Sequence, residues 1–527
     1  MKKVLVMDGV AEIGLAALRK EPDLEVVIGE KMNEDQLVEI IGDYEALIVR
    51  SATTVTARIL EHAKKMIIVG RAGVGIDNID VAAATSQGII VVNAPDGNTI
   101  AATEHTIAMM MALTRNIPQA WANLKAGAWD KKPFMGVEFR DKVLGIIGFG
   151  RIGSAVAKRA QGMEMKVIAY DPFIGVEKAE CIGVKLVPLE ELFEKADFIT
   201  NHLPLNKESR HILGAQAFAQ MKDGVRIINC ARGGVVDEQA LCAAMKSGKV
   251  AGAALDVFET EPTTQSPLFE LNNFIGTPHL GASTQEAQLN VAYDVAVDIV
   301  AALKGEFVKN AVNIPSLNFE EMAVVRPYLN LAEKMGKFAV QVVDGRTKGL
   351  EITYCGDLAN KEVSPITTAV LKGFLDVMMQ ETVNFVNADA HARNRGINVS
   401  ERKFAAAGDY ANLINLKVLT DTSRITIGGT VFGGADPRFV YINDFHVDAV
   451  PEGHMLYVPH TDRPRIIGPA ANLIGEHGVN ISGMQVGRKT IGGEAVMLLN
   501  IDHPVPEQVL AEIARIEGVI EVKNVNL

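Results

Sequence analysis

The glycine-rich stretch GFGRIG, residues 148–153, constrains the fold of this chain more than any other feature. It follows the apolar run KVLGIIGF and opens a helical pattern, and the next strand-like run, KVIAYD, ends at Asp171. This is the context of a dinucleotide-binding turn, in which Gly148 permits the turn, Gly150 admits a pyrophosphate and Gly153 lets the helix approach the strand. The segment therefore predicts a nucleotide-binding domain, and the carboxylate of Asp171 favours NAD over NADP because it repels a 2′-phosphate.

Short β-rich runs alternate with helical patterns from the start of the chain to about residue 281. The first series is KVLVMD, LEVVIG, ALIVR, MIIVG and GIIVVN, and the second is VLGIIGF, KVIAYD, DFITNHL, VRIINC, GAALDV and NFIGTP. Such alternation predicts parallel α/β sheets, and the second series predicts a Rossmann doubly wound domain over 98–281. The helical pattern after His279 is long enough to cross back, so residues 1–97 and 282–315 would form one discontinuous, flavodoxin-like substrate-binding domain.

The rest of the chain predicts two further domains. NAVNIPSLNF, residues 310–319, has the Pro and Asn of a linker. Residues 317–452 contain the helical pattern SPITTAVLKGFLDVMMQE and the strand-like run SRITIGGTVFGG, which indicate an α+β intervening domain without a defensible chemical motif. Residues 453–527 follow the order βαββαβ of a ferredoxin-like domain.

Charge and cysteine content exclude several classes of function. The formal charge of −12 over 527 residues argues against a nucleic-acid partner, because a phosphate backbone needs a basic surface. The 4 cysteines are scattered without a C-x-x-C pair, so neither a disulfide framework nor a metal site is indicated. Apolar runs stay shorter than the roughly 20 residues of a membrane span. We expect a soluble, cytoplasmic protein with a small-molecule substrate and no membrane partner.

Three polar residues follow three strands of the predicted nucleotide-binding sheet. Arg232 follows VRIINCA, Glu261 follows GAALDVFET, and His279 follows NFIGTP. Carboxyl ends of parallel strands share one sheet edge, so these side chains should meet beside the dinucleotide. An arginine can grip a carboxylate, and a glutamate can orient a histidine that transfers a proton. Each could instead be ordinary: a surface arginine, a solvated acidic loop or a histidine in a turn.

With these motifs in hand, the sequence resembles the D-isomer-specific 2-hydroxyacid dehydrogenases, in particular the long-form D-3-phosphoglycerate dehydrogenases. The resemblance rests on RSAT, RAGVGIDNID, NAPDGNT, GFGRIG, NCARGGVVDE, ALDVFETEP and TPHLGAST. It implies NAD-dependent oxidation of 3-phosphoglycerate, the first step of L-serine biosynthesis, with Arg232, Glu261 and His279 as catalytic residues. The implied cofactor contacts are Gly148, Gly150, Arg151, Ile152, Gly153, Asp171, Cys230, Ala231, Arg232, Asp256, His279 and Gly281. The implied substrate contacts are Arg50, Ser51, Gly73, Val74 and Asn98.

The C-terminal part is similar to an ACT domain, a sensor of small molecules. HTDRP at 460–464 and GVN at 478–480 carry that similarity. It implies L-serine as an effector held by His460, Asp462 and Asn480 at a domain–domain interface, although Arg465 stands where a glycine is usual. The resemblance also implies a homo-oligomer, a dimer or tetramer, in which WDKKPF could bring Lys131 or Lys132 to a neighbour's phosphate site.

Two other functions remain open at this point. A related 2-hydroxyacid dehydrogenase, acting on glyoxylate or hydroxypyruvate, would keep the same chemistry with another substrate. A non-catalytic NADH-sensing corepressor would share the fold and the three polar residues. The ACT-like C-terminal part argues against both, because neither class usually carries it. In the intervening region, which resembles an anion-binding domain, AHARNR at 390–395 is a weak candidate for an anion contact and could equally be a solvated basic turn.

Overall fold

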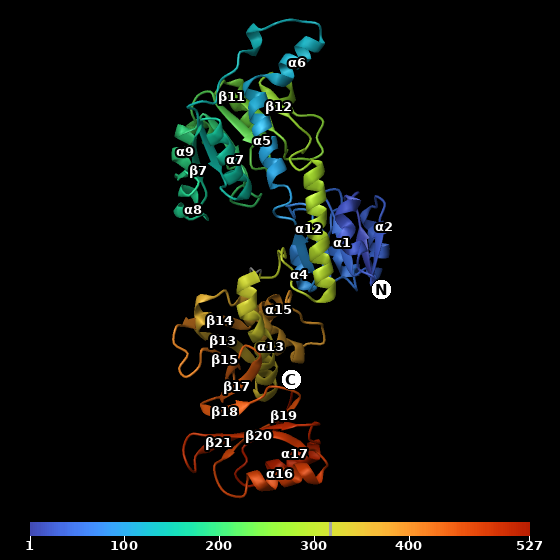
Figure 1. Ribbon diagram of the computed structural model, residues 1–527, viewed down its shortest axis with the longest axis vertical. Helices are drawn as coiled ribbons and strands as arrows, with labels where there is room; N and C mark the ends of the chain where they lie inside the picture. The colour runs from blue at the N-terminus through green and yellow to red at the C-terminus, as the bar shows by residue number, and fades with distance from the viewer. Residues whose placement is uncertain (316–318) are drawn as a thin grey trace.

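The computed structural model describes residues 1–315 and 319–527; residues 316–318 of the predicted linker lie outside the described residues. The elements form four sheets arranged along one elongated molecule (Figure 1). Two parallel sheets occupy the N-terminal part, and a mixed sheet and an antiparallel sheet follow. The expected α/β and α+β fold class is confirmed.

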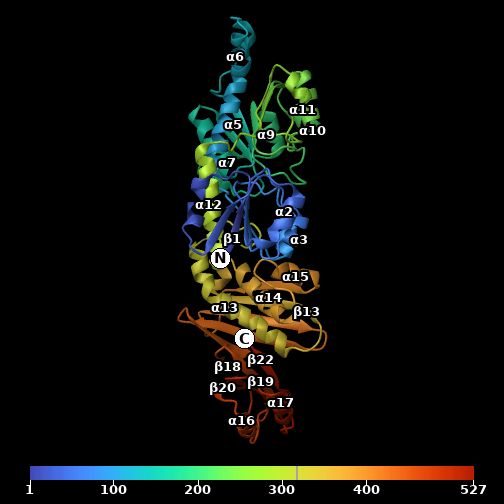
Figure 2. The ribbon, with the colours of Figure 1, turned by 90° about the vertical axis from the view of Figure 1, so that its right-hand side faces the viewer.

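The first sheet has the order β2-β1-β3-β4-β5 and is parallel throughout. Its strands are β1 (Lys2–Val6), β2 (Leu24–Ile28), β3 (Ala46–Val49), β4 (Ile68–Arg71) and β5 (Ile90–Asn93). Every residue of β3 is buried because helices cover both faces of the sheet. The helix α12 (Gln285–Lys304) crosses back from the second sheet and lies lengthwise beside the first (Figure 2). Thr284 caps its start and Gly305, with φ of 73°, ends it.

The second sheet has the order β12-β11-β10-β9-β6-β7-β8, also parallel. The strands are β6 (Val143–Ile147), β7 (Lys166–Tyr170), β8 (Lys185–Leu186), β9 (Phe198–Asn201), β10 (Val225–Asn229), β11 (Val250–Leu255) and β12 (Phe274–Gly276). The strand order reverses between β6 and β9, which is where ligands bind in open α/β sheets. The six predicted strands are all present, and β8 was missed because two residues carry no periodicity.

Helices α5 (Thr99–Thr114) and α7 (Arg151–Gly162) pack together on one face of the second sheet. The opposite face is covered by α9 (Leu189–Lys195), α10 (Ala215–Gln220) and α11 (Glu238–Lys246). The α5 helix begins where the chain leaves the first sheet, so it joins the two sheets directly. Its continuation, α6 (Ile117–Lys125), projects at the far end of the molecule (Figure 1).

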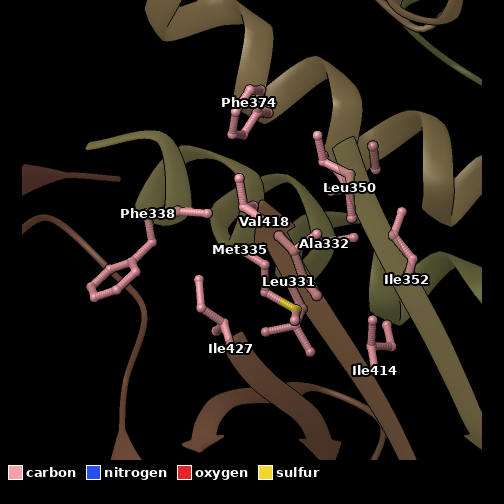
Figure 3. Close-up of a cluster of buried hydrophobic side chains, with 14 of the residues drawn as sticks. Leu331, Ala332, Met335, Phe338, Leu350, Ile352, Phe374, Ile414, Val418 and Ile427 are labelled. Atoms are coloured by element: carbon pink, nitrogen blue, oxygen red, sulfur yellow. The ribbon is translucent and has the colours of Figure 1, made fainter. Parts of the chain in front are cut away.

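The third sheet has the order β14-β13-β15-β16-β17-β18. Its strands are β13 (Thr347–Gly356), β14 (Asn398–Phe404), β15 (Asn412–Thr420), β16 (Arg424–Phe432), β17 (Asp436–Ile442) and β18 (Phe445–Ala449). Apolar side chains of α13 (Phe319–Val342) pack on this sheet, and α14 (Ser364–Met378) packs on α13 (Figure 3). The helices α13 and α14 approach closely at Gly336, where a Cβ would lie 2.2 Å from the carbonyl oxygen of Val370.

The fourth sheet has the antiparallel order β20-β21-β19-β22. Its strands are β19 (His454–Thr461), β20 (Ile481–Arg488), β21 (Glu494–Ile501) and β22 (Lys523–Asn526). Helices α16 (Ile467–Glu476) and α17 (Glu507–Ala514) cover one face. The other face joins the core around α13, where the rings of Phe338 and Tyr457 lie 5.9 Å apart. Within the described ranges, no helix combines the length and apolar content needed to cross a membrane.

Candidate active site

His279 and Glu261 meet at the carboxyl edge of the second sheet. His279 follows β12 with φ of 57°, and its Nδ1 lies 2.7 Å from Glu261 Oε2. The other carboxylate oxygen of Glu261 accepts the backbone N–H of Phe258 at 2.9 Å. The hydrogen bond with Glu261 raises the pKa of His279, although burial opposes the shift. With Nδ1 engaged, Nε2 is the atom that can exchange a proton with a substrate.

Arg232 comes from the loop after β10 and reaches the first sheet. Its Nε donates to Asp77 Oδ2 at 3.0 Å, and its Nη1 donates to the carbonyl of Ala231 at 2.7 Å. Gly75 gives the guanidinium room, because a Cβ there would lie 2.0 Å from Nη2. The positive charge of Arg232 lowers the pKa of His279, which places the two groups within electrostatic reach. Glu261 and His279 therefore meet at this sheet edge, and Arg232 is close enough to His279 to interact with it electrostatically.

A second guanidinium near Arg232 was missed by the sequence analysis. Arg71 ends β4, and its Nε is buried without a hydrogen-bond partner among the described residues. Burial, together with the charges of Arg232 and Arg50, lowers the pKa of Arg71 to about 10. Three cations that repel one another are stabilised when they share an anion. The sequence signal was available, since Arg71 opens RAGVG at a strand end.

The predicted substrate contacts line the carboxyl edge of the first sheet. Arg50 follows β3, and Asp8 holds its loop by accepting the backbone N–H groups of Arg50 and Thr53 at 2.8 and 3.0 Å. Ser51 is exposed in the same loop. Asn98 caps α5, and its Oδ1 is buried without a partner in the described part of the chain. The remaining contacts predicted on this edge are Gly73, with φ of 156°, and Val74, whose carbonyl accepts from Asn93.

The glycine loop fits a dinucleotide. Gly148 has φ of 89°, and a Cβ on Gly153 would lie 2.1 Å from its carbonyl oxygen, so the turn and the close helix require glycine at both places. By contrast, no described atom lies within 4 Å of a Cβ built on Gly150, which caps the start of α7. Open space beside a helix N-terminus is what a pyrophosphate needs. Asn201, at the switch point, has a buried amide without a partner among the described residues.

The other predicted cofactor contacts lie around this loop. Asp171 follows β7, and its Oδ2 accepts the backbone N–H of Phe149 at 2.8 Å. Arg151, the first residue of α7, pairs with Asp96 at 2.7 Å across the two sheets. Burial, followed by the charge of Asp256, raises the pKa of Cys230 to about 12, so this thiol stays neutral. The remaining predicted contacts on this edge are Ile152, Ala231, Asp256 and Gly281.

The residues predicted to bind an effector do not converge within one chain. Asp462 follows β19 and pairs with Arg488 at 2.9 Å, whereas Asn480 precedes β20 and donates to Asp502. Because Asn480 and Arg488 lie at opposite ends of β20, the two sites are separated by roughly 25 Å. His460 is 1% exposed, and its Nδ1 lies 3.1 Å from the carbonyl oxygen of Val458.

Three other stretches singled out in the sequence carry exposed charged residues in the structure. Arg465 adopts φ of 68°, a backbone conformation that favours glycine, which gives a physical reason for a glycine at this position. Lys131 and Lys132 are exposed in the segment after α6. In AHARNR, Arg393 pairs with Asp389 one helical turn away, as expected of a solvated turn rather than a preformed anion site.

Comparisons with known proteins agree with this arrangement. Residues 107–281 match the NAD binding domain of the D-isomer specific 2-hydroxyacid dehydrogenases. Residues 324–443 match the D-3-phosphoglycerate dehydrogenase intervening domain, and residues 454–518 match the ACT domain. The D-lactate dehydrogenase of Aquifex aeolicus, solved with NAD and lactic acid, is 28% identical, has a TM-score of 0.52 and covers 59% of this chain and 100% of its own.

Proteins named D-3-phosphoglycerate dehydrogenase match over the full length. That of Methanocaldococcus jannaschii is 46% identical over 528 residues, which is 100% of each chain. That of Synechocystis is 45% identical over 528 residues, which is 100% of this chain and 95% of its own. The described site and these matches lead to one assignment: the chain belongs to the D-3-phosphoglycerate dehydrogenase family, whose catalytic part is an NAD-binding 2-hydroxyacid dehydrogenase.

Proposed function

We propose that this chain oxidises 3-phospho-D-glycerate at C2 to 3-phosphohydroxypyruvate, the first step of L-serine biosynthesis. The observation that carries the proposal is the Glu261–His279 pair, at 2.7 Å, together with Arg232, whose charge interacts both with His279 and with Arg71 of the first sheet. A proton carrier and a carboxylate grip are what a 2-hydroxy acid needs. The further cations suit a substrate with a second anionic group.

The protein residues divide the reaction between them. Arg232 binds the C1 carboxylate and holds C2 in front of His279. His279 Nε2 takes the proton of the C2 hydroxyl, and Glu261 stabilises the imidazolium that results. NAD⁺, which the loop of Gly148, Gly150 and Gly153 would hold, would supply the acceptor for the hydride of C2. In the reverse direction, protonated His279 returns the proton to the carbonyl oxygen of phosphohydroxypyruvate.

The phosphate distinguishes this substrate from simpler 2-oxo acids. Arg50 follows β3 and Arg71 ends the neighbouring strand β4, and their charges interact. We infer that they bind the phosphate, because guanidinium groups donate to phosphate oxygens in pairs. The test compares kcat/KM for phosphohydroxypyruvate and glyoxylate: a preference of about a hundredfold or more for the phosphorylated acid is expected. Equal values, or a preference for glyoxylate, would overturn the substrate assignment.

Serine is the effector that we propose for the fourth sheet. Its ACT domain match indicates regulation by a small molecule. Since Asp462 and Asn480 lie at opposite ends of β20, we infer that a complete site combines Asp462 of one chain with Asn480 of another. Titration of serine into the reductase assay should give saturable inhibition. Asn480→Ala should abolish that inhibition with unchanged basal turnover, and persistence of the response would refute the site.

A homo-oligomer is the assembly that we propose. Large apolar side chains in and after α6 are exposed: Trp121 is 60%, Trp129 78% and Met135 84% exposed. Aromatic residues and Met are enriched at interfaces, so this projecting segment is the proposed dimer contact. Sedimentation of the wild type should give a dimer or tetramer, and Trp121→Glu with Trp129→Glu should dissociate it. We also propose a cytoplasmic location, in keeping with the free thiols of all four cysteines.

A further inference from the structure

His105 connects the helix between the two sheets with the loop that carries His279. It lies on α5, and its side chain is 20% exposed. Its Nε2 is 3.1 Å from Thr277 Oγ1 and 3.2 Å from Asp256 Oδ1. Neither the proton transfer nor the binding of substrate, as set out above, uses this histidine. Its two contacts, Thr277 and Asp256, nevertheless help to hold the loop that carries His279.

Asp256 is the centre of that loop. Its carboxylate is 0% exposed. Oδ1 accepts the hydroxyl of Thr277 at 2.6 Å and the backbone N–H of Leu280 at 2.7 Å, while Oδ2 accepts the backbone N–H of Gly281 at 2.7 Å. These bonds fix residues of the loop both before and after His279 in the chain. Its own backbone N–H donates to the carbonyl of Asp256 at 2.9 Å.

The loop holds His279 in a backbone conformation that needs such support. A φ of 57° at a residue other than glycine costs free energy and persists only where the surroundings enforce it. The carboxylate oxygens of Asp256 hold the loop in this conformation only while the carboxylate is ionised, because a protonated carboxyl group can accept fewer hydrogen bonds. A buried carboxylate in turn needs donors or a cation nearby. His105 is the donor that α5 contributes.

The charge state of Asp256 follows from these contacts. Burial opposes its ionisation, but the hydrogen bonds from His105, Thr277 and Leu280 outweigh burial and lower the pKa of Asp256. Other titratable groups also interact with it: Cys230 just after β10, Glu261 in the loop after β11 and His279 after β12. Cys230 is neutral, and Glu261 adds a negative charge. His105 is therefore the group outside the catalytic pair that favours the ionised form.

We propose that His105 is a positioning residue for the reaction: through Asp256 and Thr277 it holds the loop 277–281 in the conformation that presents His279. This inference rests on the proposed function in one respect, namely that His279 transfers the proton. It does not depend on which 2-oxo acid is reduced. It also gives α5 a part in catalysis, since this helix joins the sheet that binds the substrate to the sheet that carries the acid–base pair.

The experiment compares His105→Leu, His105→Gln and, as a control on the same helix, Glu104→Gln. Glu104 is exposed and pairs only loosely with Arg159, at 3.5 Å. Leucine keeps the volume but removes the donor, so kcat should fall about tenfold at pH 7 with nearly unchanged NADH affinity. Glutamine, which can still donate to Asp256, should recover most of this loss. Glu104→Gln should match the wild type.

The pH dependence separates positioning from a general loss of structure. Without His105 the pKa of Asp256 rises, so the deficit of His105→Leu should grow toward acid pH, where Asp256 of the variant takes up a proton before Asp256 of the wild type does. A deficit that is equal at every pH, or wild-type turnover in His105→Leu, would overturn the proposal. If the wild type reduces glyoxylate but not phosphohydroxypyruvate, the substrate assignment fails while the His105 comparison proceeds with glyoxylate.

An NMR titration tests the role of His105 even if the protein reduces none of the 2-oxo acids. The amide protons of Leu280 and Gly281 donate to Asp256, so their NMR shifts follow its ionisation. In the full-length protein they should titrate at higher pH in His105→Leu than in the wild type. Identical titrations in the two proteins would overturn the role of His105. If the protein reduces no 2-oxo acid, the proposed function is wrong. The titrations would still show whether His105 stabilises the ionised form of Asp256.

Discussion

Asp77 and Arg232 belong to different sheets and meet across the active site, with Oδ2 of the aspartate 3.0 Å from Nε of the arginine. Asp77 lies in the loop after β4, and Arg232 in the loop after β10. Nε of Arg232 donates to the carboxylate of Asp77, and Nη1 donates to the carbonyl of Ala231. The guanidinium thus has a fixed orientation before substrate arrives, and that orientation depends on the placement of the two sheets. Fixed donors bind a carboxylate with less loss of side-chain entropy.

Asp77→Ala should weaken this orientation. We expect kcat/KM for phosphohydroxypyruvate to fall about tenfold, mostly through KM, because the lost contact is a charged hydrogen bond. NADH affinity should not change. The matched control is Asp43→Ala, which removes an exposed carboxylate paired with Lys65 at 3.1 Å elsewhere on the first sheet. Tighter substrate binding in Asp77→Ala would mean that the aspartate competes with substrate instead of preparing the site.

Glu261→Gln should move the pH profile of the reductase reaction. Glu261 raises the pKa of His279 above its ordinary value. Reduction requires protonated His279, so the wild-type rate persists below the raised pKa and falls as pH rises through it. Glutamine removes the charge, and the fall should occur about one unit lower. Steady-state kcat between pH 5 and 9 measures this shift. Glu259→Gln, in the same loop, should leave the profile in place; equal shifts in both variants would refute the specific pairing.

Arg71→Met tests the assignment of the phosphate. The buried guanidinium has a pKa lowered to about 10 by burial and by its cationic neighbours, and an anion would relieve this strain. Methionine should raise KM for phosphohydroxypyruvate about thirtyfold, while KM for hydroxypyruvate, which lacks the phosphate, should change far less. The melting temperature should stay the same or rise, because an uncompensated buried charge is removed. Equal effects on both substrates would place Arg71 at the carboxylate.

The candidate catalytic residues could be proposed from sequence because ligands of open α/β sheets bind at the carboxyl ends of the strands. Arg232, Glu261 and His279 follow consecutive strands of one parallel sheet, so their convergence needs only the strand assignment. Arg71 also follows a strand, but its importance comes from burial and from neighbours on other strands, which sequence does not display. His105 was missed for a related reason: it lies within the long helical run 99–114, and only the packing of α5 against β11 and β12 brings it to Asp256.

The placement of the effector residues shows what the sequence alone leaves open. The resemblance to an ACT domain implies Asp462 and Asn480 as contacts at a domain–domain interface, but it does not say where each lies on the sheet. The chain passes through α16 between them, and the antiparallel pairing of β19, β20 and β21 then places Asn480 at the far end of the sheet. The β order was predicted, but register alone decides which ends coincide. The two-residue strand β8 was missed because so short a segment has no pattern.

Alanine substitutions at two glycines of the nucleotide loop should affect different properties, one the stability of the domain and the other the affinity for NADH. Gly153→Ala places a Cβ 2.1 Å from the carbonyl oxygen of Gly148, a backbone atom that cannot move without distorting the turn. We expect the free energy of unfolding of the domain to fall by about 1–3 kcal/mol. Gly150→Ala meets open space within the protein, so the melting temperature should be unchanged. Its Cβ should instead obstruct the pyrophosphate and raise the Kd of NADH about tenfold or more.

Thermal melting and NADH fluorescence titration of both variants measure the two effects separately. The control is Gly162→Ala, at the last residue of α7, where a Cβ likewise meets no described atom within 4 Å and lies away from the helix start. It should keep both the stability and the Kd of the wild type. If Gly150→Ala bound NADH as tightly as this control, the space beside the N-terminus of α7 would not hold the pyrophosphate, because a methyl group there would then have nothing to displace.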